Sequence, residues 1–134
     1  MSLNNKDEKN IDIPDIENHH YYIFSSEFDN VSTSDAMRFI IARNLMVGKD
    51  RPKQMKLIIN SPGGSVPSAF ALIDTIKGSK VPVYTYGMGE IASCGLMMFI
   101  AGEKAIVTLL AIQQSFHINT AGDHTVKITN FMQL

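Results

Sequence analysis

The sequence has little cysteine, no excess of either charge and no long apolar run. Its single cysteine, Cys94, excludes an internal disulfide and a cysteine-rich zinc site, so we expect a reducing, cytoplasmic compartment. Because 12 basic residues stand against 13 acidic ones, no basic stripe indicates a nucleic-acid partner. The longest apolar run, Leu96 to Ala101, is far too short to span a bilayer, so no membrane partner is expected.

The length and the overall composition indicate one domain. A chain of 134 residues suits a modest core, and 45% apolar and 19% charged residues are ordinary values for a globular protein. Residues 1–18 differ, because they mix Asn, Lys, Asp and Glu with isolated Ile residues. We therefore predict a flexible polar segment over residues 1–18 and a single domain over residues 19–134.

Strand and helix patterns alternate along the predicted domain. Three helices are expected, and the second, from Ser65 to Gly78, has Pro67 in its first turn. The third, from Ala92 to Ile100, is apolar nearly all round and should be buried. This alternation predicts an α/β fold with a mostly parallel sheet. The first helix is expected to follow the cap residues Ser32–Asp35 and to end at Gly48, with an apolar face formed by Ala36, Phe39, Ile40 and Val47. The apolar face of the second helix is formed by Ala69, Leu72, Ile73 and Ile76. The strands are expected over residues 20–24, 55–59, 81–86, 104–108 and 114–118.

Two turns between these elements contain residues suited to catalysis. Pro62-Gly63-Gly64 follows a strand and precedes a helix, where backbone N–H groups can approach a developing negative charge. On its own, such a turn is more often an ordinary strand-to-helix connection. Ser93, between Ala92 and Cys94 at the start of the buried helix, is a candidate nucleophile, although an N-cap serine is the commoner role.

Two further side chains are considered with Ser93. Cys94 is the rival nucleophile, but its apolar surroundings favour a small buried side chain whose N–H matters more than its sulfur. His117 lies in a strand-like segment and becomes a candidate general base only if it reaches Ser93. The spacing of the other histidines suits no metal site, so no metal is expected.

Together these segments resemble the family of Clp protease proteolytic subunits (ClpP), within the crotonase-like superfamily. The resemblance covers about residues 20–124. It implies repeated β-β-α units with a mostly parallel sheet, with the C-terminal part truncated or absent relative to the family. The residues that carry it are Ile59 to Ser65, Asp74-Thr75-Ile76, Gly87 to Gly95, Ala101-Gly102 and His117.

The resemblance implies a serine endopeptidase that hydrolyses unfolded polypeptides within an oligomeric ring. Ser93 would be the nucleophile and His117 the general base, with the N–H groups of Gly64 and Cys94 as the oxyanion hole. The ring would be a homo-oligomer that receives substrate from an AAA+ ATPase unfoldase, and the subunit itself would need no cofactor. The residues implied to line an extended peptide are Gly63, Ser65 and Val66.

Alternatives remain open at this point. The orienting Asp of the family lies beyond Leu134, and Asp123 does not match its position, which favours a catalytically impaired ring subunit or an assembly modulator. Lys104 or Lys127 is considered as a substitute base, below His117. An acyl-CoA enzyme of the same superfamily is the third reading, since such enzymes use N–H pairs but need no serine at the turn.

Overall fold

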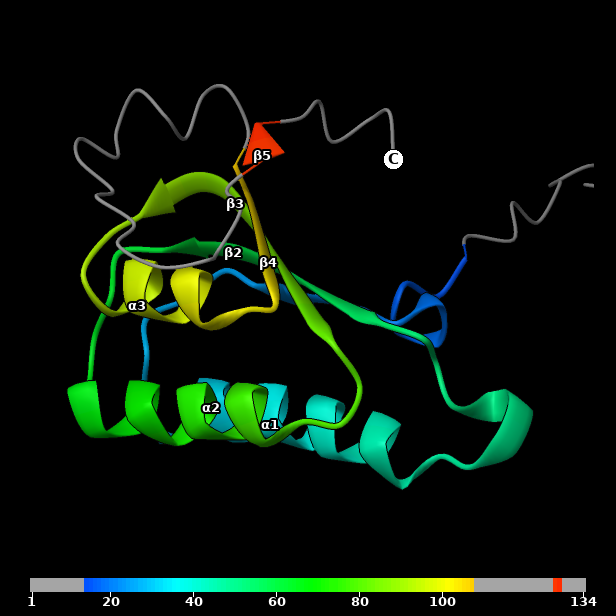
Figure 1. Ribbon diagram of the computed structural model, residues 1–134. Coiled ribbons are helices and arrows are strands. Elements are labelled where there is room, and N and C mark those ends of the chain that lie inside the picture. Colours follow the sequence, from blue (N-terminus) through cyan, green and yellow to red (C-terminus); the bar gives the residue numbers. More distant parts are fainter. Residues whose placement is uncertain (1–13, 108–126, 129–134) are drawn as a thin grey trace, which may run out of the picture.

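The computed structural model describes residues 14–107 and 127–128, which form an α/β fold (Figure 1). From β1 to β4, each strand is followed by one α-helix before the next strand, and every strand pair among the described residues is parallel. This confirms the predicted α/β class and parallel sheet. The elements are η1 (Glu17–His19), β1 (Tyr21–Phe24), α1 (Asn30–Leu45), η2 (Gly48–Asp50), β2 (Met55–Ser61), α2 (Val66–Gly78), β3 (Val83–Ile91), α3 (Cys94–Ala101), β4 (Lys104–Val107) and β5 (Lys127–Ile128).

The sheet has the order β1-β2-β3-β4-β5, so consecutive strands are always neighbours. Each connection from β1 to β4 passes through one α-helix, a crossover of the length that parallel strands need, and the first connection also includes η2. Helices α1 and α2 lie side by side against one face of the sheet (Figure 1). Because the strands are parallel, their carboxyl ends lie at the same edge of the sheet, where the turns into α2 and α3 begin.

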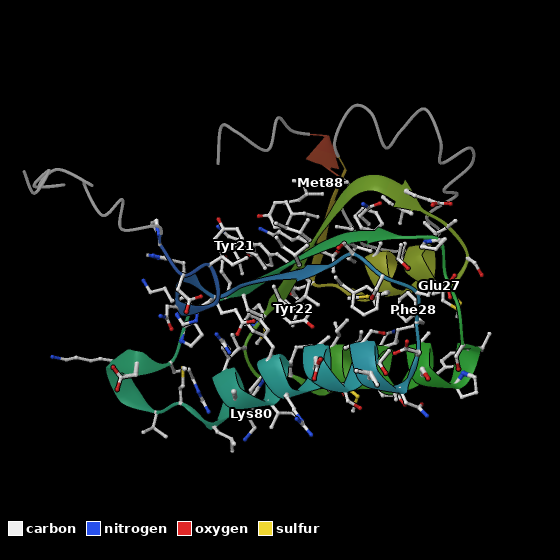
Figure 2. All side chains as sticks on the ribbon, turned by 180° about the vertical axis from the view of Figure 1, so that it is seen from behind. Tyr21, Tyr22, Glu27, Phe28, Lys80 and Met88 are labelled. Atoms are coloured by element: carbon white, nitrogen blue, oxygen red, sulfur yellow. The ribbon has the colours of Figure 1, made fainter. Side chains whose placement is uncertain are left out.

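The core lies between the sheet and the helices, and alternate strand residues face it. Leu57 and Ile59 of β2 and Leu72 of α2 are fully buried. Burial of such a side chain stabilises the fold by about 1.5–3 kcal/mol. Figure 2 shows Tyr22 directed toward the helices and Tyr21 on the opposite face of the sheet.

The opposite face has a row of alternating tyrosine and lysine side chains. Tyr21, Lys56, Tyr84 and Lys104 are register neighbours across β1 to β4. The Lys56 ammonium donates a hydrogen bond to the Tyr21 hydroxyl over 2.8 Å. The Lys104 ammonium lies 5.3 Å from the centroid of the Tyr84 ring. These contacts let the long lysine stems cover aromatic surface while their charges stay near solvent.

Helix α1 begins earlier than the sequence pattern predicted. Its N-cap is Asp29, whose side chain accepts a hydrogen bond from the Ser32 N–H, while the Ser32 hydroxyl accepts one from the Asp29 N–H. The predicted cap within Ser32–Asp35 is therefore wrong, because this reciprocal pair satisfies the first turn three residues earlier. The helix ends at Leu45, so Val47 lies outside it and is exposed rather than on the apolar face.

The other predictions agree more closely with the structure. Helix α2 has Ser65 as its N-cap and buries all four residues of the predicted stripe. Strand β3 is longer than predicted, since it continues through Gly87 and Gly89 to Ile91. Residues 1–13 and the strand predicted over residues 114–118 lie outside the described residues, whereas Glu17–His19 form a 3₁₀ turn before β1.

Candidate functional site

The two turns singled out in the sequence lie at one edge of the sheet. Strands β2 and β3 are parallel neighbours, and Ser61 at the end of β2 pairs with Ile91 at the end of β3. The turn Pro62–Gly64 leaves β2, and the turn that contains Ser93 leaves β3. In open α/β sheets, the region just beyond the carboxyl ends of the strands is where ligands generally bind.

The Pro62–Gly64 turn requires glycine at two positions. Gly63 has φ +111° and Gly64 has φ +142°, both in the region that side chains rarely adopt. A β-carbon on Gly64 would lie 2.6 Å from the backbone N and O of Phe28. The Phe28 N–H donates to the Gly63 carbonyl, and the Ser65 N–H donates to the Phe28 carbonyl, each over 2.8 Å.

These bonds determine which edge of the turn stays open. In extended backbone, successive residues direct their N–H and C=O groups to opposite edges. Gly63 and Ser65 bond to Phe28, so the N–H and C=O of Gly64 face the other edge. Gly63 itself is buried, whereas Gly64, Ser65 and Val66 are exposed.

Ser93 has an unusual backbone conformation. Its φ is 51° and its ψ is −121°, and positive φ is uncommon for any residue other than glycine. It occupies the N-cap position of α3, but its side chain makes no capping hydrogen bond, and the residue is exposed. The alternative of an ordinary N-cap serine therefore does not account for this residue. Strained backbone of this kind is concentrated at functional sites.

The two turns are in direct contact. A β-carbon built on Gly63 would meet the Cβ of Ser93, so the bare backbone of one turn abuts the side chain of the other. The Cys94 thiol donates a weak hydrogen bond to the Gly64 carbonyl over 3.7 Å. Cys94 is 1% exposed, which agrees with the prediction of a small buried side chain.

Two backbone N–H groups at this contact are available for a ligand. Gly64 precedes α2 and Cys94 is the first residue of α3, and within residues 14–107 neither N–H donates a hydrogen bond. Amides at helix N-termini carry partial positive charge. The described part of the site thus combines an exposed hydroxyl with unpaired donors, an arrangement suited to a developing oxyanion.

Sequence reasoning gave no role to two residues at the end of β2. Ser61 is fully buried, and its hydroxyl donates to the Ser26 carbonyl over 2.6 Å. The Asn60 side chain accepts a hydrogen bond from the Glu90 N–H over 2.9 Å, beneath Gly89. Their place within Ile59 to Ser65, one of the segments that carry the resemblance, was the signal in the sequence for a supporting function.

Of the candidate general bases, Lys104 and Lys127 lie within the described residues and His117 does not. His117 lies outside the described residues, as do Asp123 and His124. Lys104 pairs with Tyr84, seven positions before the end of β3 at Ile91. At the usual rise of a strand this places Lys104 roughly 20 Å from the turn that contains Ser93, so it is wrong as a substitute base. Lys127 pairs with Ile106, and a basic role for it stays a prediction.

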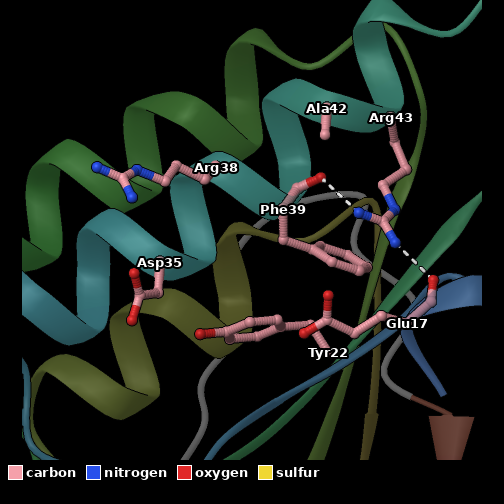
Figure 3. Close-up of a pocket in the computed structure, with 7 residues that line it drawn as sticks. All are labelled: Glu17, Tyr22, Asp35, Arg38, Phe39, Ala42 and Arg43. Carbon is pink, nitrogen blue, oxygen red and sulfur yellow. Dashed lines mark hydrogen bonds between the residues drawn. The ribbon is translucent and has the colours of Figure 1, made fainter. Parts of the chain in front are cut away.

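Three side chains with shifted pKa values, those of His20, Tyr22 and Arg43, lie at the other end of the molecule. A cavity of about 420 Å³ lies between α1 and the segment around β1, with Glu17, Asp35 and Arg38 among its lining residues (Figure 3). Burial lowers the pKa of Arg43, whose guanidinium lies 3.7 Å from the centroid of the Phe39 ring. This cavity adjoins the start of β1 and not the turns at the carboxyl edge.

No three His, Cys, Asp or Glu side chains within residues 14–107 and 127–128 gather closely enough to hold a metal ion. Among the same residues, no helix has the length and apolar character needed to cross a membrane.

Comparison with known proteins relates these turns to peptidases. A model of the Clp protease family matches residues 10–125. The chain is 42% identical over 52 residues to ATP-dependent Clp protease proteolytic subunit 2 of Treponema pallidum, a match that covers 39% of this chain and 26% of that protein. It is 43% identical over 60 residues to proteolytic subunit 1 of Corynebacterium jeikeium, which covers 45% of this chain and 32% of that protein. The matched segments thus span about a third or less of these relatives.

Proposed function

This chain belongs to the Clp protease family, and we propose that it is a serine-endopeptidase subunit that hydrolyses peptide bonds of unfolded polypeptides within an oligomeric ring. The observation that carries the proposal is the conformation of Ser93. Its backbone is strained, its hydroxyl caps no helix, and its side chain contacts the glycine turn, in which the Gly64 N–H donates no hydrogen bond within residues 14–107. An ordinary structural serine would not need this combination.

The chemistry follows the usual course of acyl transfer. The Ser93 Oγ attacks the carbonyl carbon of the scissile peptide, and His117 takes the hydroxyl proton. The N–H groups of Gly64 and Cys94 stabilise the resulting oxyanion, a contribution of about 10²–10³ in turnover for each such donor. The amine leaves with the proton from His117, and water then hydrolyses the ester on Ser93.

The substrate would bind as an extended strand along the open edge of the glycine turn. Because Phe28 already pairs with the other edge, the N–H and C=O of Gly64 are the groups that a peptide can reach. Gly63, Ser65 and Val66 would flank it. Strand addition of this kind recognises backbone rather than sequence, which suits an enzyme that acts on many unfolded chains.

Assembly and supply of substrate are part of the same proposal. The relatives named above are proteolytic subunits of an ATP-dependent protease. We extend to this chain a homo-oligomeric ring in the cytoplasm, an AAA+ ATPase unfoldase as partner and a peptidase subunit without a cofactor.

A fluorophosphonate probe tests the proposal directly. The full chain should be labelled at one residue, identified as Ser93 by peptide mass mapping, and Ser93→Ala should not be labelled. Size-exclusion chromatography with light scattering should show an oligomer for both proteins. An oligomer that is never labelled would replace the peptidase with the impaired ring subunit, and binding of an acyl-CoA ester would favour the acyl-CoA reading.

A further inference from the structure

Ser61 connects three segments at the carboxyl edge of the sheet. It is the last residue of β2 and is fully buried. Its hydroxyl donates to the Ser26 carbonyl over 2.6 Å and accepts from the Gly63 N–H over 3.2 Å. Its own carbonyl accepts from the Ala92 N–H over 3.1 Å. One residue thus bonds to the loop after β1, the glycine turn and the turn that contains Ser93.

The packing around Ser61 is as close as its hydrogen bonding. A β-carbon on Gly95 would lie 2.9 Å from the Ser61 carbonyl oxygen, so the first turn of α3 rests on the end of β2. The register between β2 and β3 shifts just before Ser61, since Ile59 pairs with Gly87 but Ser61 pairs with Ile91. Strand β3 therefore has two extra residues here, a bulge of the kind that redirects a side chain near an active site.

The bulge itself is held by the neighbouring residue. The Asn60 side-chain oxygen accepts a hydrogen bond from the Glu90 N–H. Gly89, with φ +71°, has no side chain and therefore leaves room for the Asn60 side chain. After this irregular stretch, the pairing of Ser61 with Ile91 is the contact that restores the register. Ile91 is two residues before Ser93, and Ser61 is two residues before Gly63. The position of Ser93 relative to Gly63 therefore depends on how firmly Ser61 is held.

We propose that Ser61 is a positioning residue that holds the glycine turn and the Ser93 turn in one geometry. This inference rests on the proposed peptidase function. Ser61 touches no reacting atom; it acts through Gly63 on one side and Ala92 on the other. A small side chain that both donates and accepts is required, because alanine would leave the buried Gly63 N–H unpaired and would remove the bond to the Ser26 carbonyl.

The experiment compares Ser61→Ala with Ser79→Ala in the full chain. Ser79 is the matched control, because its hydroxyl also donates to a carbonyl, that of Val81, and accepts from a side chain, that of Asn44. It follows the far end of α2, away from the site. The readouts are the two constants for fluorophosphonate inactivation, kinact and KI, with the melting temperature of each variant.

A positioning role makes a specific prediction for these constants. In Ser61→Ala, kinact should fall by about 10-fold to 100-fold with KI unchanged, since displacement of reacting groups by about 1 Å slows chemistry by this order. Ser79→Ala should also lower the melting temperature, because it removes the same kind of bonds, and it should leave kinact unchanged. Equal kinact in wild type and Ser61→Ala, or an equal fall in both variants, would overturn the positioning role.

Hydrogen exchange separates this inference from the proposed function. The Ala92 amide bonds to the Ser61 backbone, which the substitution does not remove, so faster exchange of Ala92 in Ser61→Ala reports loss of the linkage between the turns. Ala92 exchange that is as slow as in wild type would overturn the inference even if no probe labels Ser93. Absence of labelling in wild type, together with faster Ala92 exchange, would overturn the peptidase function alone.

Discussion

Gly63 lies against Ser93 so closely that a β-carbon on Gly63 would be 2.8 Å from the Cβ and 3.3 Å from the Oγ of Ser93. The two residues belong to different turns that leave neighbouring strands. Their contact is possible only because one of them has no side chain and adopts φ +111°. The geometry of the candidate nucleophile is therefore set partly by a residue far from it in the sequence.

The first prediction concerns Gly63→Ala. The added methyl group should displace Ser93 and lower its rate of fluorophosphonate labelling by about 100-fold, because small displacements of reacting groups have effects of this size. The melting temperature should also fall, since alanine is strained at this φ. The rates and melting curves of purified variants measure both effects.

Gly78→Ala is the control for this substitution. Gly78 ends α2, and no heavy atom lies within 4 Å of a β-carbon built there. Its labelling rate should equal that of wild type, and its stability should be the same or slightly higher, because alanine restricts the unfolded chain. Labelling of Gly63→Ala at the wild-type rate would show that the two turns do not form one site.

The second prediction is that Ser93→Gly gains stability while it loses labelling. Serine at φ 51° stores strain that glycine does not, and such a residue raises the free energy of the fold by about 1 kcal/mol or more. Ser93→Gly should therefore unfold at a higher denaturant concentration than Ser93→Ala, which keeps the strained β-carbon. A less stable glycine variant would mean that this backbone conformation is not strained.

Much of the fold follows from local patterns in the sequence. The sequence predicts helix α2 from Ser65 to Gly78 because the cap residue, Pro67 and an apolar stripe all agree, and the helix runs from Val66 to Gly78 with Ser65 as its N-cap. The short apolar runs of β1 and β2 were predicted for the same reason. Local agreement of this kind makes an element predictable from one sequence.

The missed features depend on contacts between distant segments. The extension of β3 through Gly87 and Gly89 is stabilised by Ile59 and Asn60 of the neighbouring strand β2. In the local sequence, these glycines indicate a turn. The turn that contains Ser93 is likewise held by distant segments, because the Ala92 N–H donates to the Ser61 carbonyl and Gly63 lies against the Ser93 side chain. The sequence pattern identified the site residues as candidates, but it contained no information on the strain that distinguishes Ser93.

The third prediction distinguishes Ser93 from the rival nucleophile Cys94. Because Cys94 is 1% exposed and its thiol lies against the Gly64 carbonyl, a thiol reagent should modify the native protein slowly and the unfolded protein quickly. Cys94→Ala should keep its fluorophosphonate labelling within a few-fold of wild type and lose about 1 kcal/mol of stability. Complete loss of labelling in a folded Cys94→Ala protein would transfer the nucleophile to the thiol.

The fourth prediction concerns pH and His20. Burial and the nearby Arg43 lower the pKa of this imidazole below its ordinary value of 6.5, so the fold favours the neutral ring. As pH falls below 6.5, the unfolded chain binds the proton first, and stability should decrease. His20→Asn suits the left-handed backbone at φ 65° and cannot titrate, so its melting temperature should fall less between pH values well above and well below 6.5. An equal fall in both proteins would show that other groups cause the pH dependence.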